Sequence, residues 1–219
     1  DRFLQVAIEH PEKVKDFLSG LRVQLARGLV REEEGRIVRH VSAVVSGQGS
    51  KQLVIEEVIE AIEQVFDPAI VGIGVGVPSV VDVEKGIVYD VQNIPSWDEV
   101  GVKEILEKRF SRPVYVNNDA NCFALSEAHG GAASGARVVF GVIIGTGTGG
   151  GVVVDGRVLT GPNAVAGEWG HNPLPRPHPE ELPGPSCYCG HRGCIETFLS
   201  GPGLAQDHLA ATGQAVQPP

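Results

Sequence analysis

The sequence predicts an α/β fold, and three observations carry this prediction. Strand-like and helix-like segments alternate over residues 51–127, as they do in chains that build a sheet covered by helices. An apolar stripe with helical spacing runs through residues 51–66, and its members are Ile55, Val58, Ile59, Ile62 and Val65. The glycine run GTGTGGG separates two apolar stretches within residues 138–161 and predicts two strands joined by a tight loop.

The N-terminal elements follow from local patterns. Residues 1–18 are charged with scattered apolar positions and predict a helix. Residues 21–30 and 36–45 alternate in part and are separated by EEEG, which predicts a β-hairpin with Gly35 in its turn.

The middle of the chain supplies the strand and helix alternation. Residues 69–79 predict a buried strand that enters a glycine-rich turn, and residues 80–91 predict a hairpin that turns at 84–86. A helix around 101–110 and a strand over 113–116 follow.

The bulk composition is that of an ordinary globular protein. The chain has 219 residues, of which 42% are hydrophobic, and no apolar run approaches the ~18 residues of a membrane span. Its net charge of −9 argues against a broad nucleic-acid-binding surface. A signal-peptide pattern is absent from the N-terminus, and clustered cysteines suit a reducing compartment, so we expect a cytoplasmic protein without nucleic-acid or membrane partners.

Composition changes along the chain and predicts two domains. Every lysine lies at or before Lys108, whereas glycine and proline concentrate after Leu125. We expect an N-terminal α/β domain over residues 1–117 and a partial C-terminal α/β domain over residues 118–219, which carries the glycine run and a cysteine cluster.

A cysteine cluster near the C-terminus predicts a structural zinc site. Cys187, Cys189 and Cys194 follow His171 with the spacing H-x15-C-x-C-x4-C, and three thiolates with one imidazole make a closed tetrahedral set. His178 and His191 compete with His171 as the fourth ligand, and a disulfide with one free thiol is the alternative to a metal.

The segment VNNDAN places Asn118 and Asp119 where a strand ends and a helix begins. Ligands of open α/β sheets gather at this edge. Asp119 has two interpretations: it caps the helix that begins at Ala120, or it supplies a carboxylate to chemistry at the edge. Cys122, inside the helix, is most simply a buried small apolar residue.

The motifs EWGH and CYCGHRGCIETFLSG, together with NDAN, resemble the ROK family of sugar kinases and related repressors. Within the family, GHNPLP and CYCG…GCIETF look most like bacterial fructokinases. The resemblance implies an actin-like ATPase fold of two domains and the ATP-dependent phosphorylation of a hexose at its 6-hydroxyl, with Mg²⁺. It also implies a structural Zn²⁺, and we expect a homodimer.

The resemblance also implies roles for single residues. Asp119 would be the general base, and residues 145–148 would form the second phosphate loop, with Gly145, Thr146, Gly147 and Thr148 as its members. The loop NIPSW resembles a sugar-contacting loop in which Ser96 replaces a common glycine. The implied sugar shell is Asn93, Asn118, Asp119, Glu168, His171 and Glu196.

Two departures from the family pattern bear on activity. The D-x-G-G-T-K phosphate loop of the family is expected near residues 19–24, where the sequence is SGLRVQ, and the family's adenosine segment and closing helix do not follow the zinc motif. We therefore expect this chain to bind hexose weakly and to phosphorylate it slowly. The rival interpretations are a sugar-binding ROK transcriptional regulator and a catalytically impaired sugar-binding fragment.

Overall fold

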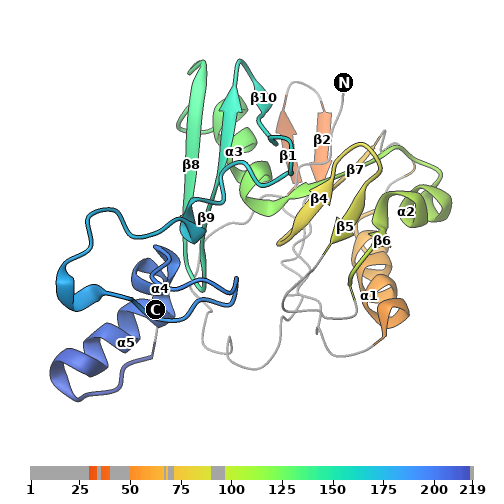
Figure 1. Cartoon of the computed structure of the whole chain (residues 1–219). Coiled ribbons are helices and arrows are strands. Elements are labelled where there is room, and N and C mark those ends of the chain that lie inside the picture. The colour runs from red at the N-terminus through yellow and green to blue at the C-terminus, as the bar shows by residue number, and fades with distance from the viewer. Residues whose placement is uncertain are drawn as a thin grey trace. The chain divides into compact units, whose positions relative to one another are not determined.

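The chain forms two compact units, Asp1–Ser126 and Glu127–Pro219, in a computed structural model (Figure 1). The structure describes residues 30–33, 36–39, 50–66, 68, 72–89 and 97–217. The helix expected over 1–18, most of the strand expected over 21–30 and the altered loop expected at 19–24 lie outside these ranges. The division of the chain falls within a helix, after Ser126, whereas the change in composition predicts a domain boundary after residue 117.

Two parallel strands form the centre of the first unit. The strands β3 (Ile73–Val77) and β7 (Val114–Asn118) pair in parallel with Gly76 opposite Asn117 and Val77 opposite Asn118. Val114 and Val116 are buried while Tyr115 between them is exposed, so β7 turns one face to the core. The carboxyl ends of both strands therefore lie side by side, immediately before α3 (Asp119–Gly130).

An antiparallel ribbon accompanies this pair. It consists of β4 (Val80–Asp82), β5 (Ile87–Tyr89) and β6 (Val100–Gly101). The predicted turn between β4 and β5 is confirmed, and Gly86 takes a φ of 64° there. A Cβ at Gly86 would also overlap the Cβ of Lys103, so glycine is required for space as well as for conformation.

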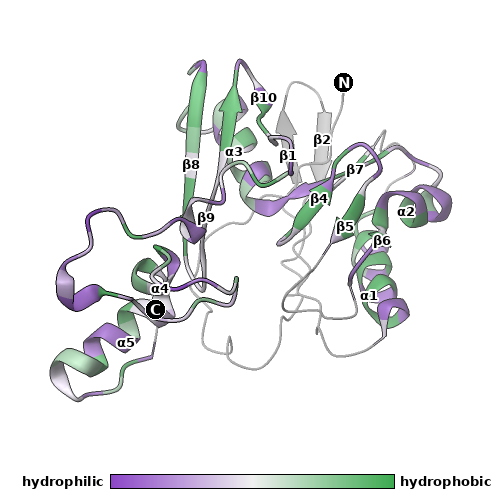
Figure 2. Ribbon diagram, viewed as in Figure 1, coloured by the Kyte–Doolittle hydropathy of each residue, from purple (hydrophilic) through white to green (hydrophobic). Residues whose placement is uncertain are grey.

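The helices α1 (Lys51–Glu63) and α2 (Val102–Phe110) supply the rest of the core of the first unit. The predicted α1 stripe is confirmed and widened, because Val54 and Ala61 are buried together with Ile55 and Ile62. In α2, Val102, Leu106 and Phe110 are buried at the i, i+4 and i+8 positions of one face. Figure 2 shows both green, hydrophobic and purple, hydrophilic residues along the two helices.

The N-terminal hairpin is confirmed in its described part. The strands β1 (Val30–Glu33) and β2 (Arg36–Arg39) pair antiparallel with Glu33 opposite Arg36.

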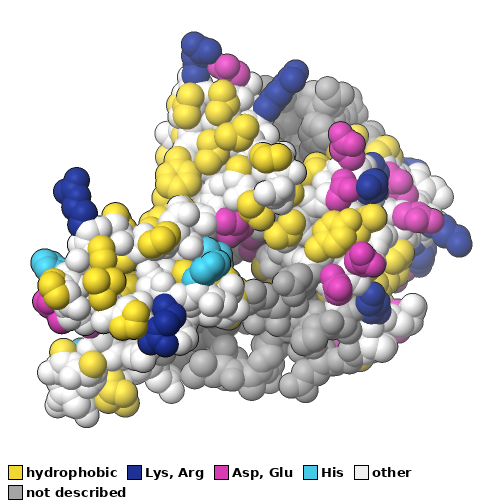
Figure 3. All heavy atoms as spheres, viewed as in Figure 1, with side chains coloured by type: hydrophobic (Ala, Val, Ile, Leu, Met, Phe, Trp, Pro, Cys, Tyr) yellow, Lys and Arg dark blue, Asp and Glu magenta, His cyan; other side chains and the backbone are white. Residues whose placement is uncertain are grey.

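The second unit is built on an antiparallel sheet of β8 (Val138–Ile144), β9 (Thr148–Val154) and β10 (Arg157–Val158), in the order β10-β9-β8. Alternate residues of β8 leave an apolar face exposed, and Figure 3 shows hydrophobic side chains gathered there. Its members are Val138, Phe140, Val142 and Ile144, which are 66%, 51%, 42% and 55% exposed.

Loops and short helices complete the second unit. They are the 3-10 helices η1 (Trp169–His171) and η2 (Pro179–Glu181), followed by α4 (Glu196–Leu199) and α5 (Gly201–Thr212). The Ser200 side chain accepts a hydrogen bond from the Gly203 N–H and so caps α5, which ends at Gly213 with a φ of 71°. Over the described residues, every helix is too short or too polar to span a bilayer.

Candidate active site and metal centre

Asp119 lies at the end of the parallel strand pair, as its sequence position predicted. The helix cap is made by its neighbour: the Asn118 side-chain oxygen accepts a hydrogen bond from the Asn121 N–H at 3.1 Å, and the Asn118 amide donates to the Ser79 carbonyl at 3.3 Å. Asn118 therefore fills the capping role that sequence analysis left open for Asp119. The Asp119 Oδ1 accepts from the Ala120 N–H at 2.8 Å.

Burial changes the acidity of the Asp119 carboxyl. Its half-buried position raises its pKa above the ordinary value, because the charged form loses hydration, and the hydrogen bond from Ala120 opposes only part of this shift. The same environment raises the pKa of Cys122 to about 11, through burial first and then the charge of Asp119. A carboxylate of raised pKa at the carboxyl end of parallel strands is typical of a functional site.

The strand β3 approaches this helix start at Gly76. A Cβ at Gly76 would lie 3.5 Å from the Cys122 Sγ and 3.6 Å from the Asp119 Cα, which is ordinary contact distance, so this position leaves room for a small side chain and no more. Asn93, which the sequence analysis assigned to the sugar shell, and Ser96 lie outside the described residues.

The glycine loop joins β8 to β9 in the second unit. Gly145 donates to the Gly147 carbonyl at 2.9 Å, and Thr148 donates to the Glu196 Oε2 at 2.8 Å. Among the described residues, the N–H groups of Thr146 and Gly147 have no hydrogen-bond acceptor, and the buried Thr148 hydroxyl has no partner. Adjacent backbone donors in a glycine-rich turn are a feature by which proteins can bind an anion.

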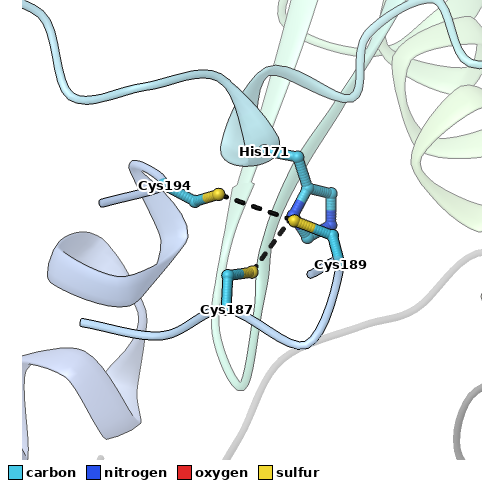
Figure 4. A group of neighbouring side chains, drawn as sticks. All are labelled: His171, Cys187, Cys189 and Cys194. Atoms are coloured by element: carbon cyan, nitrogen blue, oxygen red, sulfur yellow. Dashed lines mark hydrogen bonds between the residues drawn. The ribbon is translucent and has the colours of Figure 1, made fainter. Parts of the chain in front are cut away.

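The four predicted metal ligands converge in the second unit (Figure 4). One ligand atom from each of His171, Cys187, Cys189 and Cys194 lies within 4.8 Å of all the others. The His171 Nδ1 is 3.5 Å from the Cys187 Sγ, and the Sγ atoms of Cys189 and Cys194 are 3.6 Å apart. A tetrahedral site with metal–sulfur bonds of about 2.3 Å has edges of about 3.8 Å, so this donor set fits zinc.

The structure also distinguishes the competing histidines. His191 contacts one thiol, with its Nδ1 3.5 Å from the Cys189 Sγ, and His178 begins η2. Within the described part of the chain, His171 is the imidazole that forms a four-ligand group with all three thiols. All four cysteines are free thiols, so the disulfide alternative is not the arrangement observed.

Backbone hydrogen bonds fold the cysteine loop around this point. Cys187 donates to the His191 carbonyl at 2.9 Å, and Ser186 and Arg192 form an isolated antiparallel bridge. Gly190 and Gly193 have φ angles of 88° and 69°, a conformation that favours glycine. Hydrogen bonding from the His191 backbone lowers the pKa of Cys189 to about 6, whereas burial raises the pKa of Cys194 to about 12.

Sequence reasoning missed two aromatic residues at this site. The Tyr188 hydroxyl lies 2.8 Å from the His171 Nε2, with the two rings edge to face. A histidine that ligates through Nδ1 commonly donates its other N–H to a second group, and Tyr188 occupies that position. Burial, and then the charges of Glu196, Cys187 and Glu168, raise the pKa of Tyr188.

The second aromatic residue is Trp169, whose indole N–H donates to the Gly149 carbonyl at 2.6 Å. Its ring meets Phe140 edge to face, with centroids 6.2 Å apart. Trp169 therefore ties η1, which carries His171, to the strand that follows the glycine loop. Both residues belong to motifs that identified the site, but their partners are long-range in sequence.

The candidate residues divide between the two units. Asn118 and Asp119 belong to the first, whereas the glycine loop, Glu168 and the four metal ligands belong to the second, together with Glu196. Within the second unit, Glu168 and Glu196 are linked electrostatically to the cysteine loop, because the charges of both raise the pKa of Tyr188.

Comparison with known proteins identifies the family. The ROK family model matches residues 24–217. The chain is 38% identical over 174 residues to a glucokinase of Thermotoga maritima, an alignment that covers 79% of this chain and 53% of that protein. It is 43% identical over 149 residues to an N-acetyl-D-glucosamine kinase of Photobacterium profundum, which covers 66% of this chain and 49% of that protein.

A solved structure agrees. The ROK family glucokinase of Streptomyces griseus, determined with glucose and AMPPNP, superposes with a TM-score of 0.66 and 30% identity over 85% of this chain and 58% of that one. The chain therefore spans about half the length of the curated relatives it matches. The predicted actin-like α/β fold is confirmed, and the chain belongs to the ROK family.

Proposed function

We propose that this chain is part of an ATP-dependent sugar kinase that phosphorylates a hexose at its 6-hydroxyl. The observation that carries the proposal is the half-buried Asp119 carboxylate at the carboxyl end of two parallel strands, relieved of helix capping by Asn118. The family membership and the kinase names of the relatives support it.

Asp119 would act as the general base. Its carboxylate takes the proton of the hexose hydroxyl while that oxygen attacks the γ-phosphorus, and the bond to the β–γ bridging oxygen breaks to release ADP. A carboxyl whose pKa is raised by burial is a stronger base than an ordinary aspartate, which favours this proton transfer.

The glycine loop would bind phosphate. The N–H groups of Thr146 and Gly147 are the available donors among the described residues of the loop. Mg²⁺ bound with ATP supplies neutralisation of the phosphate charge. These donors position the transferred group rather than react with it.

The proposed sugar shell is the set of polar residues named above: Asn93, Asn118, Asp119, Glu168, His171 and Glu196. Carboxylates accept hydrogen bonds from the hydroxyls of a hexose, which is why glutamates suit such a shell. The motif resemblance favours fructose, whereas the names of the relatives favour glucose or N-acetylglucosamine. We propose glucose or its 2-acetamido derivative, and fructose is the alternative that the assay must include.

The cysteine loop would hold one Zn²⁺ in a closed site of three thiolates and one imidazole. The ligands hold η1 to the segment before α4, so the ion would stabilise structure and make no contact with the sugar. We also propose that the protein is a homodimer, which light scattering would test.

A coupled ADP-release assay with glucose, N-acetylglucosamine and fructose tests the function. Asp119→Asn should abolish turnover and leave most of the sugar affinity, because the amide still hydrogen-bonds but accepts no proton. Asp82→Asn, in the β4–β5 hairpin, is the matched control and should turn over as the wild type does. Hexose binding without turnover in the wild type would instead support a sugar-binding regulator or an impaired kinase.

A further inference from the structure

Glu196 links the cysteine loop to the glycine loop. It opens α4 two residues after Cys194, and its side chain is buried. Its Oε2 accepts a hydrogen bond from the Thr148 N–H at 2.8 Å, across 48 residues of sequence. A carboxylate that accepts from a buried backbone N–H forms a charge-assisted bond, which is stronger than a bond between neutral groups.

Gly147 is shaped by this contact. A Cβ there would lie 2.7 Å from the same Glu196 Oε2, so only glycine permits the carboxylate to reach the loop without a shift. The other end of the loop is also held, because the Gly201 N–H at the start of α5 donates to the Gly145 carbonyl at 2.7 Å. The segment 196–201 therefore fixes both ends of the glycine loop.

The free donors lie between these two anchors. Thr146 and Gly147 carry the N–H groups that have no acceptor among the described residues, and Glu196 fixes the residue that follows them. A rotation of the Glu196 side chain would release the Thr148 N–H and with it the orientation of the two donors.

We propose that Glu196 is a positioning residue that couples the sugar site to the phosphate loop. The inference rests on the proposed function. A carboxylate has about four lone-pair sites, so Oε2 can hold the Thr148 N–H while Oε1 accepts from a hexose hydroxyl. A bound hexose then fixes the Glu196 side chain and, through Thr148, orders the donors that receive the phosphate. Coupling of this kind is reciprocal, so nucleotide must also tighten sugar binding.

Hydrogen exchange of the loop amides tests the first half of the proposal. Wild type, Glu196→Ala and Glu196→Gln are compared without ligand and with glucose or N-acetylglucosamine. Glu196→Ala should accelerate exchange of the Thr148 amide on the order of tenfold or more, because this N–H loses a charge-assisted bond. Glu196→Gln keeps one oxygen for Thr148 and should retain most of the protection.

Glu127→Gln is the matched control. The Glu127 Oε2 also accepts from a backbone N–H, that of Ala132 at 2.8 Å, in the same unit but in a turn after α3. Hydrogen exchange of residues 145–148 in the Glu127→Gln variant should match that of the wild type. Zinc content and exchange elsewhere in the unit establish that the Glu196 variants are folded.

The ligand arms test the second half. Hexose should slow exchange over residues 145–148 in the wild type and not in Glu196→Gln, and glucose should tighten AMPPNP binding roughly fivefold or more in the wild type alone. Unchanged loop exchange in Glu196→Ala, or equal coupling in Glu196→Gln and wild type, overturns the proposal. A wild type that binds neither ligand would count against the proposed kinase, while the unliganded comparison still decides whether Glu196 holds the loop.

Discussion

The Asp119 carboxylate destabilises the fold when it is ionised, and it also has a proposed catalytic role. Burial raises its pKa, so the folded state binds this proton more tightly than the unfolded chain does. Stability therefore falls as the pH rises from the ordinary value near 3.8 through the folded pKa, and it is regained as the pH returns towards 3.8. At neutral pH the ionised Asp119 carboxylate therefore lowers the free energy of unfolding.

The first prediction follows from this sign. Asp119→Asn should raise the melting temperature at pH 7, and the gain should shrink as the pH falls to about 4. Asp82→Asn should lower the melting temperature at pH 7, and this loss should shrink as the pH falls. The reason is that the Lys85 backbone N–H lowers the pKa of Asp82, so its ionised form stabilises the fold. Melting curves of both variants between pH 3.5 and 8 check this, and equal pH profiles would refute the assignment of Asp119 as a strained charge.

Cys122 supplies a second prediction at the residue scale. Its pKa of about 11 leaves only about one thiol in ten thousand ionised at pH 7, and thiolate is the reactive form. Ellman's reagent should therefore modify Cys122 more slowly than Cys189, whose pKa is about 6, and the Cys122→Ser variant should keep the fast phase of Cys189 unchanged. Rapid modification of Cys122 in the folded protein would show that Asp119 and its surroundings are more open than described.

Among the elements, η1 depends on glycine for its approach to β9. A Cβ at Gly170 would overlap the Thr148 carbonyl oxygen, a backbone atom that cannot move aside cheaply. Gly170→Ala should therefore destabilise the second unit by about 1–3 kcal/mol or more. Gly149→Ala is the control, since nothing lies within 4 Å of a Cβ there, and denaturant unfolding of the two variants should differ accordingly.

The cysteine loop and η1 are held together by the proposed zinc site, which gives the fourth prediction. The purified protein should contain one zinc per chain, and Cys189→Ala should lose it and loosen the loop, whereas Cys122→Ala should keep it. Zinc should also be released on acidification, because ligation requires deprotonated thiols and burial raises the pKa of Cys194 to about 12 without metal. Metal analysis across pH checks this, and full occupancy in Cys189→Ala would exclude the site.

At the scale of the whole molecule, the sequence predicted those features that depend on residues close together in the chain. The α1 stripe and the β4–β5 turn depend on neighbours a few residues apart, and both were confirmed. The metal set was predictable because its cysteines are close in sequence and their chemistry is distinctive.

The remaining contacts depend on how the chain returns on itself. Nothing near Glu196 in sequence indicates that it accepts from Thr148, and nothing near Tyr188 indicates a bond to His171. The helix cap shifted by one residue, from Asp119 to Asn118, because helix ends are set by backbone geometry that pattern alone leaves open by a residue or two. With Asn118 as the cap, the Asp119 carboxylate remains available for the general-base role proposed above.

Each compact unit contains one of the two tryptophans, so tryptophan fluorescence can report on each unit separately. Trp97 is 3% exposed in the core of the first unit, and Trp169 joins η1 to β9 in the second. In the Trp97→Phe variant, a zinc chelator should shift the remaining emission to longer wavelength as the η1 contact loosens. In Trp169→Phe the same treatment should leave the emission unchanged, so the fluorescence of one chain can separate loss of metal from unfolding of the first unit.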